Sequence, residues 1–262
     1  RDNADWSAHI YIKLREWLGS GKEILARREG GFKKRAVFFP ELNSDELAEL
    51  SDDDLEQLAI SIGFSMALLH EIPSSFKFPV SVPNALFTNE MSSAFSLEDA
   101  YSNLLGNMLG ARAARSAIPF NQAMTDLLLE ELTELEAQPR ANTFEAYEMV
   151  RNQWWIQGFN STFKNILKRD FTFEGEISPR LIENTSFCSR QTVPKKITIP
   201  KVLSNGRPID DYYEIRGTMN KKLKKGLKKL DISINNPLTQ FHYPQVIKAI
   251  KADFIRQLGR DI

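Results

Sequence analysis

The chain has 262 residues, of which 42% are hydrophobic, so it is long enough for one large domain or two small ones with a substantial core. Lys and Arg together number 34, as do Asp and Glu, so no overall field favours nucleic acid or acidic lipid. The single cysteine, Cys188, excludes an internal disulfide and a cysteine-rich zinc module.

The first 40 residues predict a helix followed by a β-hairpin. Asp5 can cap this helix, whose apolar residues recur at helical spacing and include Trp6, Ile10, Leu14 and Trp17. We expect the helix to end at the glycines that follow. Two β-prone stretches then flank Gly30-Gly31, an arrangement that is typical of a hairpin.

An acidic segment and a long apolar helix come next. Residues 41–56 hold eight carboxylates and no Lys or Arg, but they lack the alternating ligands and the glycine of an EF-hand calcium loop. Ser51 and Asp54 have the spacing of a capping box. From about residue 52 to 72 apolar residues occupy most sides, which predicts a central buried helix. Residues 73–95 are irregular, and a loop of that length usually indicates a functional or lid-like segment.

Three amphipathic helices are expected between residues 96 and 159. The first is capped by Ser96, with Asp99 three residues on, and carries Gly106 and Gly110, a small-residue notch that another helix can approach closely. Two more follow over about 121–139 and 143–159, each with a polar N-cap and a Pro or Gly stop. Residues 41–168 therefore predict a helical bundle.

The composition changes after Phe171. Short β-prone pieces alternate with Gly, Pro and Asn, and two helices close the chain, a basic one near 218–230 and another after Pro244. The predicted fold class is mainly α: a multi-helix bundle with an early β-hairpin and a small irregular β-containing C-terminal lobe. We expect a helical core domain over 1–170 and an accessory lobe over 171–262, packed on the core as one unit.

The stretch LLHEIPSSF at residues 68–76 begins like a zinc-peptidase helix. In the HExxH pattern, two histidines one turn apart share a metal and the glutamate acts as general base. His70 and Glu71 are in place here. Ser74 stands where the second histidine would be, and Pro73 ends the helix, so a zinc peptidase of this type is disfavoured.

A site completed from elsewhere is the remaining possibility for this histidine. The irregular loop leaves one helix and returns to start another, so Glu90, Glu98 and Asp99 could join His70 as ligands of a divalent metal or orient it as a base. In the alternative interpretation, His70 caps the last carbonyls of its helix, and Glu98 and Asp99 only interact with the dipole of the next helix.

Other candidate clusters are weaker. Asp5 and His9 share a helix face, but an exposed first-turn pair is the usual outcome. Cys188 and His242 lie 54 residues apart and carry no local signature of a nucleophile and its base. GxxxxGK[ST], GxGxxG, GxSxG and Cys/His zinc spacings are missing, which argues against nucleotide-driven and serine-hydrolase functions.

The stretch NKKLKKGLKKL at residues 220–230 holds six lysines, with its leucines on one helical side. Such a helix can lie on an anionic membrane or follow a phosphate backbone, and we expect the binding residues to be Lys221, Lys222, Lys224 and Lys225. No aromatic residues alternate with the lysines, so specific nucleic-acid binding is not expected. The alternative is a solvated surface helix with the acidic segment 41–56 as its intramolecular partner.

Four stretches resemble a bacterial family of exported envelope proteins of unknown function, the DUF4056-like proteins. They are RDNADWSAHI at 1–10, FSMALLHEI at 64–72, SSAFSLEDAYSNLLGNMLGARA at 92–113 and NGRPIDDYYEI at 205–215. The resemblance implies a periplasmic or outer-membrane-associated location, and it implies one functional surface that includes His70, Glu71, Glu90, Glu98, Asp99 and Asn103. Because no activity is known for the family, the resemblance implies no mechanism.

Two functions therefore compete. The first is an envelope hydrolase with His70 as base or metal ligand, Glu71 and Glu98 as acid or ligand partners, and Asn103 positioning the substrate. Its cofactor would be a divalent metal held by His70, Glu90, Glu98 and Asp99. The second is a non-catalytic binding or scaffold protein, whose helical surface binds a partner and whose lysine-rich helix makes peripheral contact with a membrane or an envelope polymer. No apolar run approaches the roughly 20 residues needed to span a bilayer.

Overall fold

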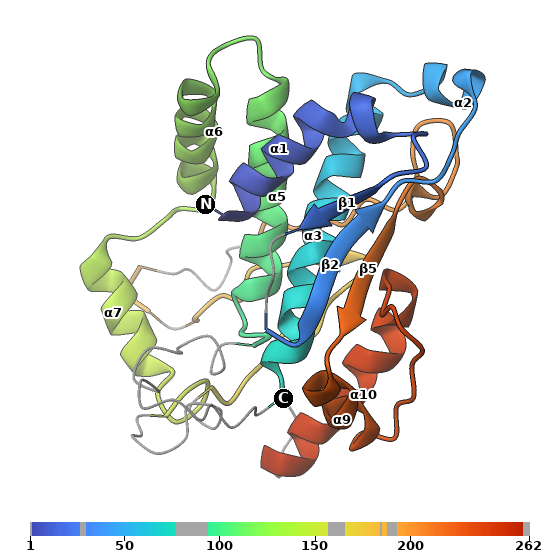
Figure 1. Ribbon diagram of the computed structural model, residues 1–262. Coiled ribbons are helices and arrows are strands. Elements are labelled where there is room, and N and C mark those ends of the chain that lie inside the picture. Colours follow the sequence, from blue (N-terminus) through green and yellow to red (C-terminus); the bar gives the residue numbers. More distant parts are fainter. Residues whose placement is uncertain are drawn as a thin grey trace.

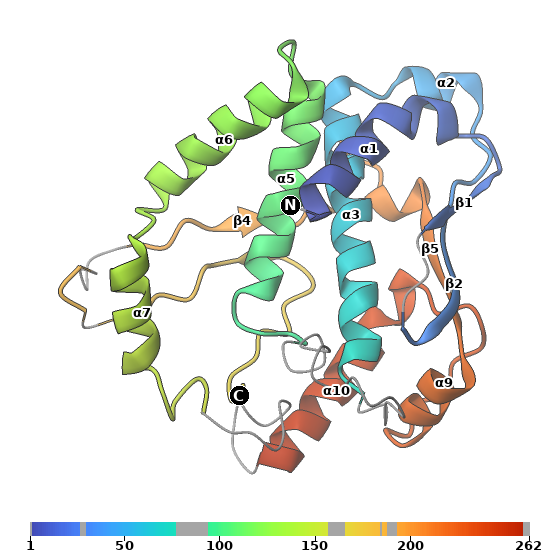
Figure 2. The ribbon, with the colours of Figure 1, turned by 60° about the vertical axis from the view of Figure 1, so that its left-hand side comes forward.

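The computed structural model describes residues 2–26, 30–76, 94–156, 166–183, 185–187 and 193–258. At its centre three helices pack together: α1 (Asp2–Trp17), α3 (Asp52–Ser74) and α5 (Asp99–Arg115). A three-stranded sheet covers one side of these helices, and α6 (Phe120–Glu134) and α7 (Arg140–Met149) lie on the other (Figures 1 and 2). The mainly α fold with an early hairpin is confirmed.

The sheet joins the two ends of the chain. β1 (Glu23–Ala26) and β2 (Phe32–Phe38) form the antiparallel hairpin that the sequence predicted. β5 (Glu214–Met219) pairs antiparallel with the other edge of β2, with Val37 opposite Ile215. The central strand of the sheet therefore lies between an early strand and one from the predicted C-terminal lobe, which fixes the residues around 214–219 against the helical core.

Helix α3 is the buried centre because apolar residues surround it. Its start is the predicted capping box: the Ser51 side chain accepts from the Asp54 backbone N–H, and the Asp54 carboxylate accepts from the Ser51 backbone N–H. Ser204 adds hydrogen bonds to the same carboxylate through its backbone N–H and its hydroxyl, both at 2.7 Å. Burial acts to raise the pKa of Asp54, but the hydrogen bonds from Ser51 and Ser204 outweigh it and hold the pKa at about 2.

Helix α3 ends about two residues later than the sequence predicted. Pro73 was expected to end the helix, but the helix continues through it to Ser74. Proline removes one backbone donor and leaves its own carbonyl available. The last turn closes because the Ser75 backbone N–H donates to the Glu71 carbonyl at 3.1 Å and the Ser74 hydroxyl donates to the His70 carbonyl at 2.9 Å.

The notch in α5 is where α1 crosses; the sequence predicted close approach of a helix there without indicating which one. A Cβ atom at Gly110 would lie 2.1 Å from the carbonyl oxygen of Ala4, so only glycine permits this approach of the two backbones. The Ser7 hydroxyl donates to the carbonyl of Asn107 at 2.7 Å across the same contact. The notch therefore fixes how α1 sits on α5.

Beyond α5 the chain departs further from expectation. The helix predicted over 143–159 is shorter: α7 ends at Met149, and Asn152 adopts a left-handed φ of 64°. Trp155 turns back and stacks on Tyr147, with ring centroids 4.1 Å apart, while its indole N–H donates to the Tyr147 carbonyl at 2.9 Å. Stacking and this hydrogen bond thus replace another helical turn.

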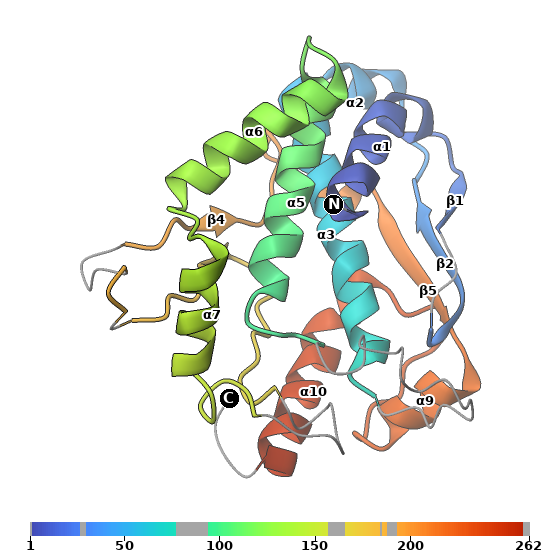
Figure 3. The same cartoon turned by 90° about the vertical axis from the view of Figure 1, so that its left-hand side faces the viewer.

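The C-terminal residues form small elements around the core. β3 (Glu176–Ile177) and β4 (Ile197–Thr198) make a two-stranded pair. Two 3₁₀ turns cover Ile209–Asp211 and Gln240–His242. The closing helices are α9 (Lys221–Lys228) and α10 (Tyr243–Leu258), and a short helix α2 (Ser44–Ala48) precedes α3. Figure 3 shows α9 beyond the end of the sheet where β5 finishes, and α10 crossing below α3 and α5.

Candidate functional site

The end of α3 and the start of α5 do lie close together, as the loop between them suggested. Glu71 is 7% exposed, and its carboxylate accepts a hydrogen bond from the backbone N–H of Phe95 at 2.9 Å. Ser96 pairs with Arg169 in an antiparallel bridge, and the Asp170 backbone N–H donates to the Phe95 carbonyl at 2.8 Å. The residues just before α5 are thus held between α3 and a segment from much later in the chain.

Arg169 is the centre of this arrangement. Its side chain donates to the carbonyl of Ala94 and places the guanidinium carbon 4.8 Å from the ring centroid of Phe254, and the residue is 4% exposed. Burial lowers the pKa of Arg169 to about 10, while the carboxylates of Asp99, Glu71 and Glu98 oppose that change. Arg169 therefore stays charged at neutral pH, and these carboxylates balance its buried charge.

Asp99 belongs to the same cluster. It accepts a hydrogen bond from the Ser96 backbone N–H at 2.8 Å, and burial raises its pKa although hydrogen bonding from the side chain and the backbone of Ser96 opposes the change. The prediction that Ser96 caps α5 is wrong: Glu98 is at the N-cap position, and no side chain caps the helix there. Two residues, Leu97 and Glu98, form a turn between Ser96 and the helix because the bridge to Arg169 holds Ser96 in extended pairing.

The other predicted site residues are spread around this cluster. His70 is half-buried at the last turns of α3, and Glu98 is exposed. Asn103 faces α1, where its side-chain oxygen accepts from the Asn3 amide at 2.7 Å. The structure therefore brings Glu71 and Asp99 to Arg169, whereas Asn103 is already engaged in the contact between α1 and α5.

The predicted metal site stays a prediction. Glu90 lies outside the described residues, as does Cys188. Within the described ranges, no group of three or more His, Cys, Asp or Glu side chains is arranged to hold a metal ion. His9 packs its ring near Trp6 and Trp17, at centroid distances of 6.1 and 5.6 Å, and is exposed. Its environment is therefore aromatic.

The lysine-rich helix forms a second charged feature. All six lysines between residues 221 and 229 are exposed, and across the described parts of the chain none has a side-chain ion pair. Leu223 and Leu227 are 0% and 2% exposed and face the core. Asn220 caps the helix by accepting from the Leu223 backbone N–H at 2.9 Å.

The acidic segment is not the partner of these lysines. Four of its eight carboxylates pair with arginines instead: Asp52 pairs with Arg15 at 2.6 Å, and Glu46 pairs with Arg207 at 2.6 Å. Arg115 pairs with Asp53 and with Glu56. Across the described parts of the chain no lysine of α9 pairs with this segment, so the structure gives no support to the intramolecular alternative.

Comparison with known proteins gives one match. A family model described as a protein of unknown function (DUF4056) matches residues 1–183. Searches among curated proteins and among solved structures gave no match. In the described part of the chain, no helix has both the length and the apolar character needed to cross a membrane. The functional proposal therefore rests on the geometry of the described residues.

Proposed function

We propose, for a chain that belongs to the DUF4056 family of proteins of unknown function, a non-catalytic role: binding to an anionic membrane surface through the lysine face of α9. One observation carries this proposal, namely six exposed lysines that have no ion pair among the described residues. At 3.6 residues per turn the six lie within an arc of roughly 160°. That arc is opposite the two buried leucines, so the lysines share one face.

The contact would be electrostatic, without insertion of the helix. An interfacial helix normally buries its apolar side among the lipids. In α9 that side is already used, because Leu223 and Leu227 pack into the protein core. Lipid phosphates would thus be bound by ammonium groups alone, each contributing about 1 kcal/mol near an anionic leaflet. Such binding weakens as salt shortens the screening length to about 8 Å at physiological ionic strength.

The helix is held firmly enough to present its charges as a group. The Asn220 backbone N–H donates to the Gly31 carbonyl at 2.9 Å, which ties the start of α9 to the hairpin turn. A Cβ atom at Gly226 would lie 2.8 Å from the Phe76 ring, so the helix is in close contact with the end of α3. The resemblance to exported envelope proteins supports a bacterial, periplasmic or outer-membrane-facing location for this binding.

The hydrolase hypothesis has one observation in its favour, the closeness of the α3 end and the α5 start. Glu71 and Asp99, however, already accept backbone hydrogen bonds and balance Arg169. These structural interactions are enough to explain both carboxylates, and no catalytic role is needed for either. Binding through α9 uses side chains that have no structural task, and for that reason we place it first.

Vesicle co-sedimentation tests the proposal. We expect binding to vesicles with 30% phosphatidylglycerol at 50 mM salt, weaker binding at 300 mM salt, and none to pure phosphatidylcholine. The test variant replaces four lysines of α9 with serine: Lys221, Lys222, Lys224 and Lys225. Loss of about 2 to 4 kcal/mol predicts an affinity reduced roughly 30- to 1,000-fold. A control of equal charge replaces four lysines elsewhere: the partly exposed Lys13, which pairs with Glu16, and the exposed Lys22, Lys168 and Lys201.

Three results would contradict the proposal. The α9 variant could bind like the unmodified protein, or the scattered control could lose as much affinity as the α9 variant. Retention on immobilised heparin without vesicle binding would assign the lysines to an anionic polymer instead of a membrane.

A further inference from the structure

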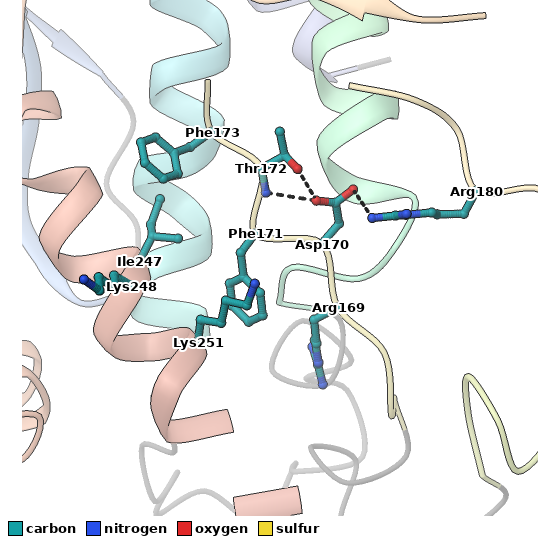
Figure 4. A pocket seen from close by; sticks show the side chains of 9 residues that line it. All are labelled: Arg169, Asp170, Phe171, Thr172, Phe173, Arg180, Ile247, Lys248 and Lys251. Carbon is teal, nitrogen blue, oxygen red and sulfur yellow. Dashed lines mark hydrogen bonds and ion pairs between the residues drawn. The ribbon is translucent and has the colours of Figure 1, made fainter. Parts of the chain in front are cut away.

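A pocket of about 320 Å³ lies between α10 and the segment 169–173. Phe171 and Phe173 point from this segment toward α10, whereas Asp170 points the other way, toward Arg180 (Figure 4). The volume is at the lower end of the range for small-molecule sites, roughly 300 to 1,000 Å³. The space therefore suits a compact molecule with about one ring.

The lining of the pocket is strongly basic. Among the described residues that line it, four are cationic, Arg169, Arg180, Lys248 and Lys251, and only Asp170 is acidic. Lys248 and Lys251 are exposed, and neither has an ion pair among the residues that the structure describes. They are three residues apart on α10 and so share a face of the helix. Their two charges are thus available to a ligand.

Asp170 does not neutralise that charge at the lysine side. Its carboxylate accepts from the Thr172 backbone N–H at 2.9 Å and from the Thr172 hydroxyl at 2.6 Å. Its other oxygen lies 3.8 Å from the Arg180 guanidinium. The acid is therefore occupied at the Arg180 end, and the unbalanced positive charge remains at Lys248 and Lys251.

The apolar wall is rigid. Phe171 is 9% exposed, and its ring centroid lies 4.8 Å from that of Phe95 and 5.7 Å from that of Phe254. Phe254 in turn carries the Arg169 guanidinium on its face. The aromatic wall is thus fixed by the same cluster that joins α3 to α5, so a ligand would meet a preformed surface.

We infer that this pocket binds a small phosphomonoester whose body is an apolar or flat ring. Lys248 and Lys251 are one turn apart on α10, so their flexible side chains can bring two ammonium groups to one phosphate. A phosphate with nearly two negative charges gains more from two ammonium groups than a carboxylate with one. The ring would lie against Phe171 and Phe173, and the phosphate would lie at Lys248 and Lys251. This site is separate from the lysines of α9 and does not depend on membrane binding.

Isothermal titration with four probes tests the inference: phenyl phosphate, inorganic phosphate, benzoate and benzyl alcohol. We expect phenyl phosphate to bind more tightly than each of the others, on the order of tenfold, because only it offers both a ring and a double charge. Equal binding of inorganic phosphate would refute the role of the apolar wall. Benzoate binding as tightly as phenyl phosphate would refute the preference for phosphate.

Variants locate the binding. Lys248→Ser with Lys251→Ser should weaken phenyl phosphate binding about tenfold or more, and both are surface positions that leave folding intact. Arg180→Ser should have a smaller effect, because Arg180 lies beside Asp170. The fourfold α9 variant is the matched control and should bind phenyl phosphate normally. Unchanged binding by the Lys248/Lys251 variant, or a larger loss with Arg180→Ser, would overturn the inference.

Discussion

Gly110→Ala should destabilise the protein, while Gly106→Ala one turn earlier on the same helix should not. A Cβ atom at position 110 would lie 2.1 Å from the Ala4 carbonyl oxygen and 2.6 Å from its Cα, both of them backbone atoms of α1. At position 106 the nearest atom, the Cβ of Asn3, is 3.4 Å away, which is ordinary contact. The two substitutions are chemically identical, so the difference between their effects on the unfolding free energy measures the contact between α1 and α5.

The expected change in unfolding free energy is the sum of two opposing effects. Alanine favours a helix over glycine by about 1 kcal/mol at either position. At position 110 the backbones must separate, and overpacking of this kind costs about 1 to 3 kcal/mol, with the upper end expected for a clash with backbone. The net loss of unfolding free energy should be about 2 kcal/mol for Gly110→Ala, with a gain of up to about 1 kcal/mol for Gly106→Ala.

Thermal and urea unfolding measure this difference. A loss of about 2 kcal/mol lowers Tm by roughly 4 to 8 °C in a domain of this size. The urea midpoint should fall for Gly110→Ala and stay level or rise for Gly106→Ala. Equal midpoints for the two variants would show that α1 does not cross α5 at Gly110, and the description of the core helices would be wrong.

Three further predictions concern charged and ionisable groups. Because the folded-state pKa of Asp54 is about 2 and lies below its ordinary value of 3.8, its stabilisation of about 2 kcal/mol should be present above pH 4 and disappear as pH falls toward 2. Urea unfolding of Asp54→Asn should therefore show a flatter pH profile, and an unchanged profile would contradict the assignment. Glu71→Gln keeps an oxygen for the Phe95 N–H but removes a charge that balances Arg169, so unfolding free energy should drop by about 1 to 3 kcal/mol. If the hydrolase hypothesis holds, His70→Ala folds normally and loses activity or bound metal, whereas empty metal analysis with a lower Tm refutes it.

Local patterns in the sequence predicted the elements whose environment is local. Ser51 and Asp54 form the capping box that their spacing indicates, and α3 is central because it is apolar on most sides. The glycine notch of α5 predicted a close helix without naming α1. Each of these features depends on residues within one or two turns of each other, where side-chain chemistry decides the backbone conformation.

Long-range pairing could not be predicted in the same way. The pairing of β5 with β2 depends on which edge the folded core leaves open, and nothing near residues 214–219 specifies that partner. The sequence predicted one amphipathic helix over about 143–159, with a polar N-cap and a glycine stop. Instead Asn152 turns the chain and Trp155 finds Tyr147 as a stacking partner, a tertiary contact that periodicity does not show.

For the candidate site, the sequence indicated one half of the charged cluster. Glu71 and Asp99 were expected near each other because one helix ends where the next begins. Arg169 was missed because it follows a stretch without periodicity and comes about seventy residues after Asp99. Nothing in the sequence distinguishes Arg169 from its neighbour Lys168. Its position beside the acids becomes visible only once the bridge between Ser96 and Arg169 is known.

The chain is neutral overall, yet its two lysine surfaces are positive, and the reason lies in how its acids are paired. Arginines such as Arg15, Arg115 and Arg207 take the carboxylates of the acidic segment. A planar guanidinium with weak hydration suits such pairing. The lysines that do form ion pairs, such as Lys195 with Glu131, bind acids elsewhere in the chain. The positive charges of the lysines of α9 and α10 therefore remain unpaired among the described residues, although the net charge of the chain is zero. Because this charge is exposed, salt should weaken vesicle binding through α9 and phenyl phosphate binding at α10 alike, and only vesicle binding should depend on the lysines of α9.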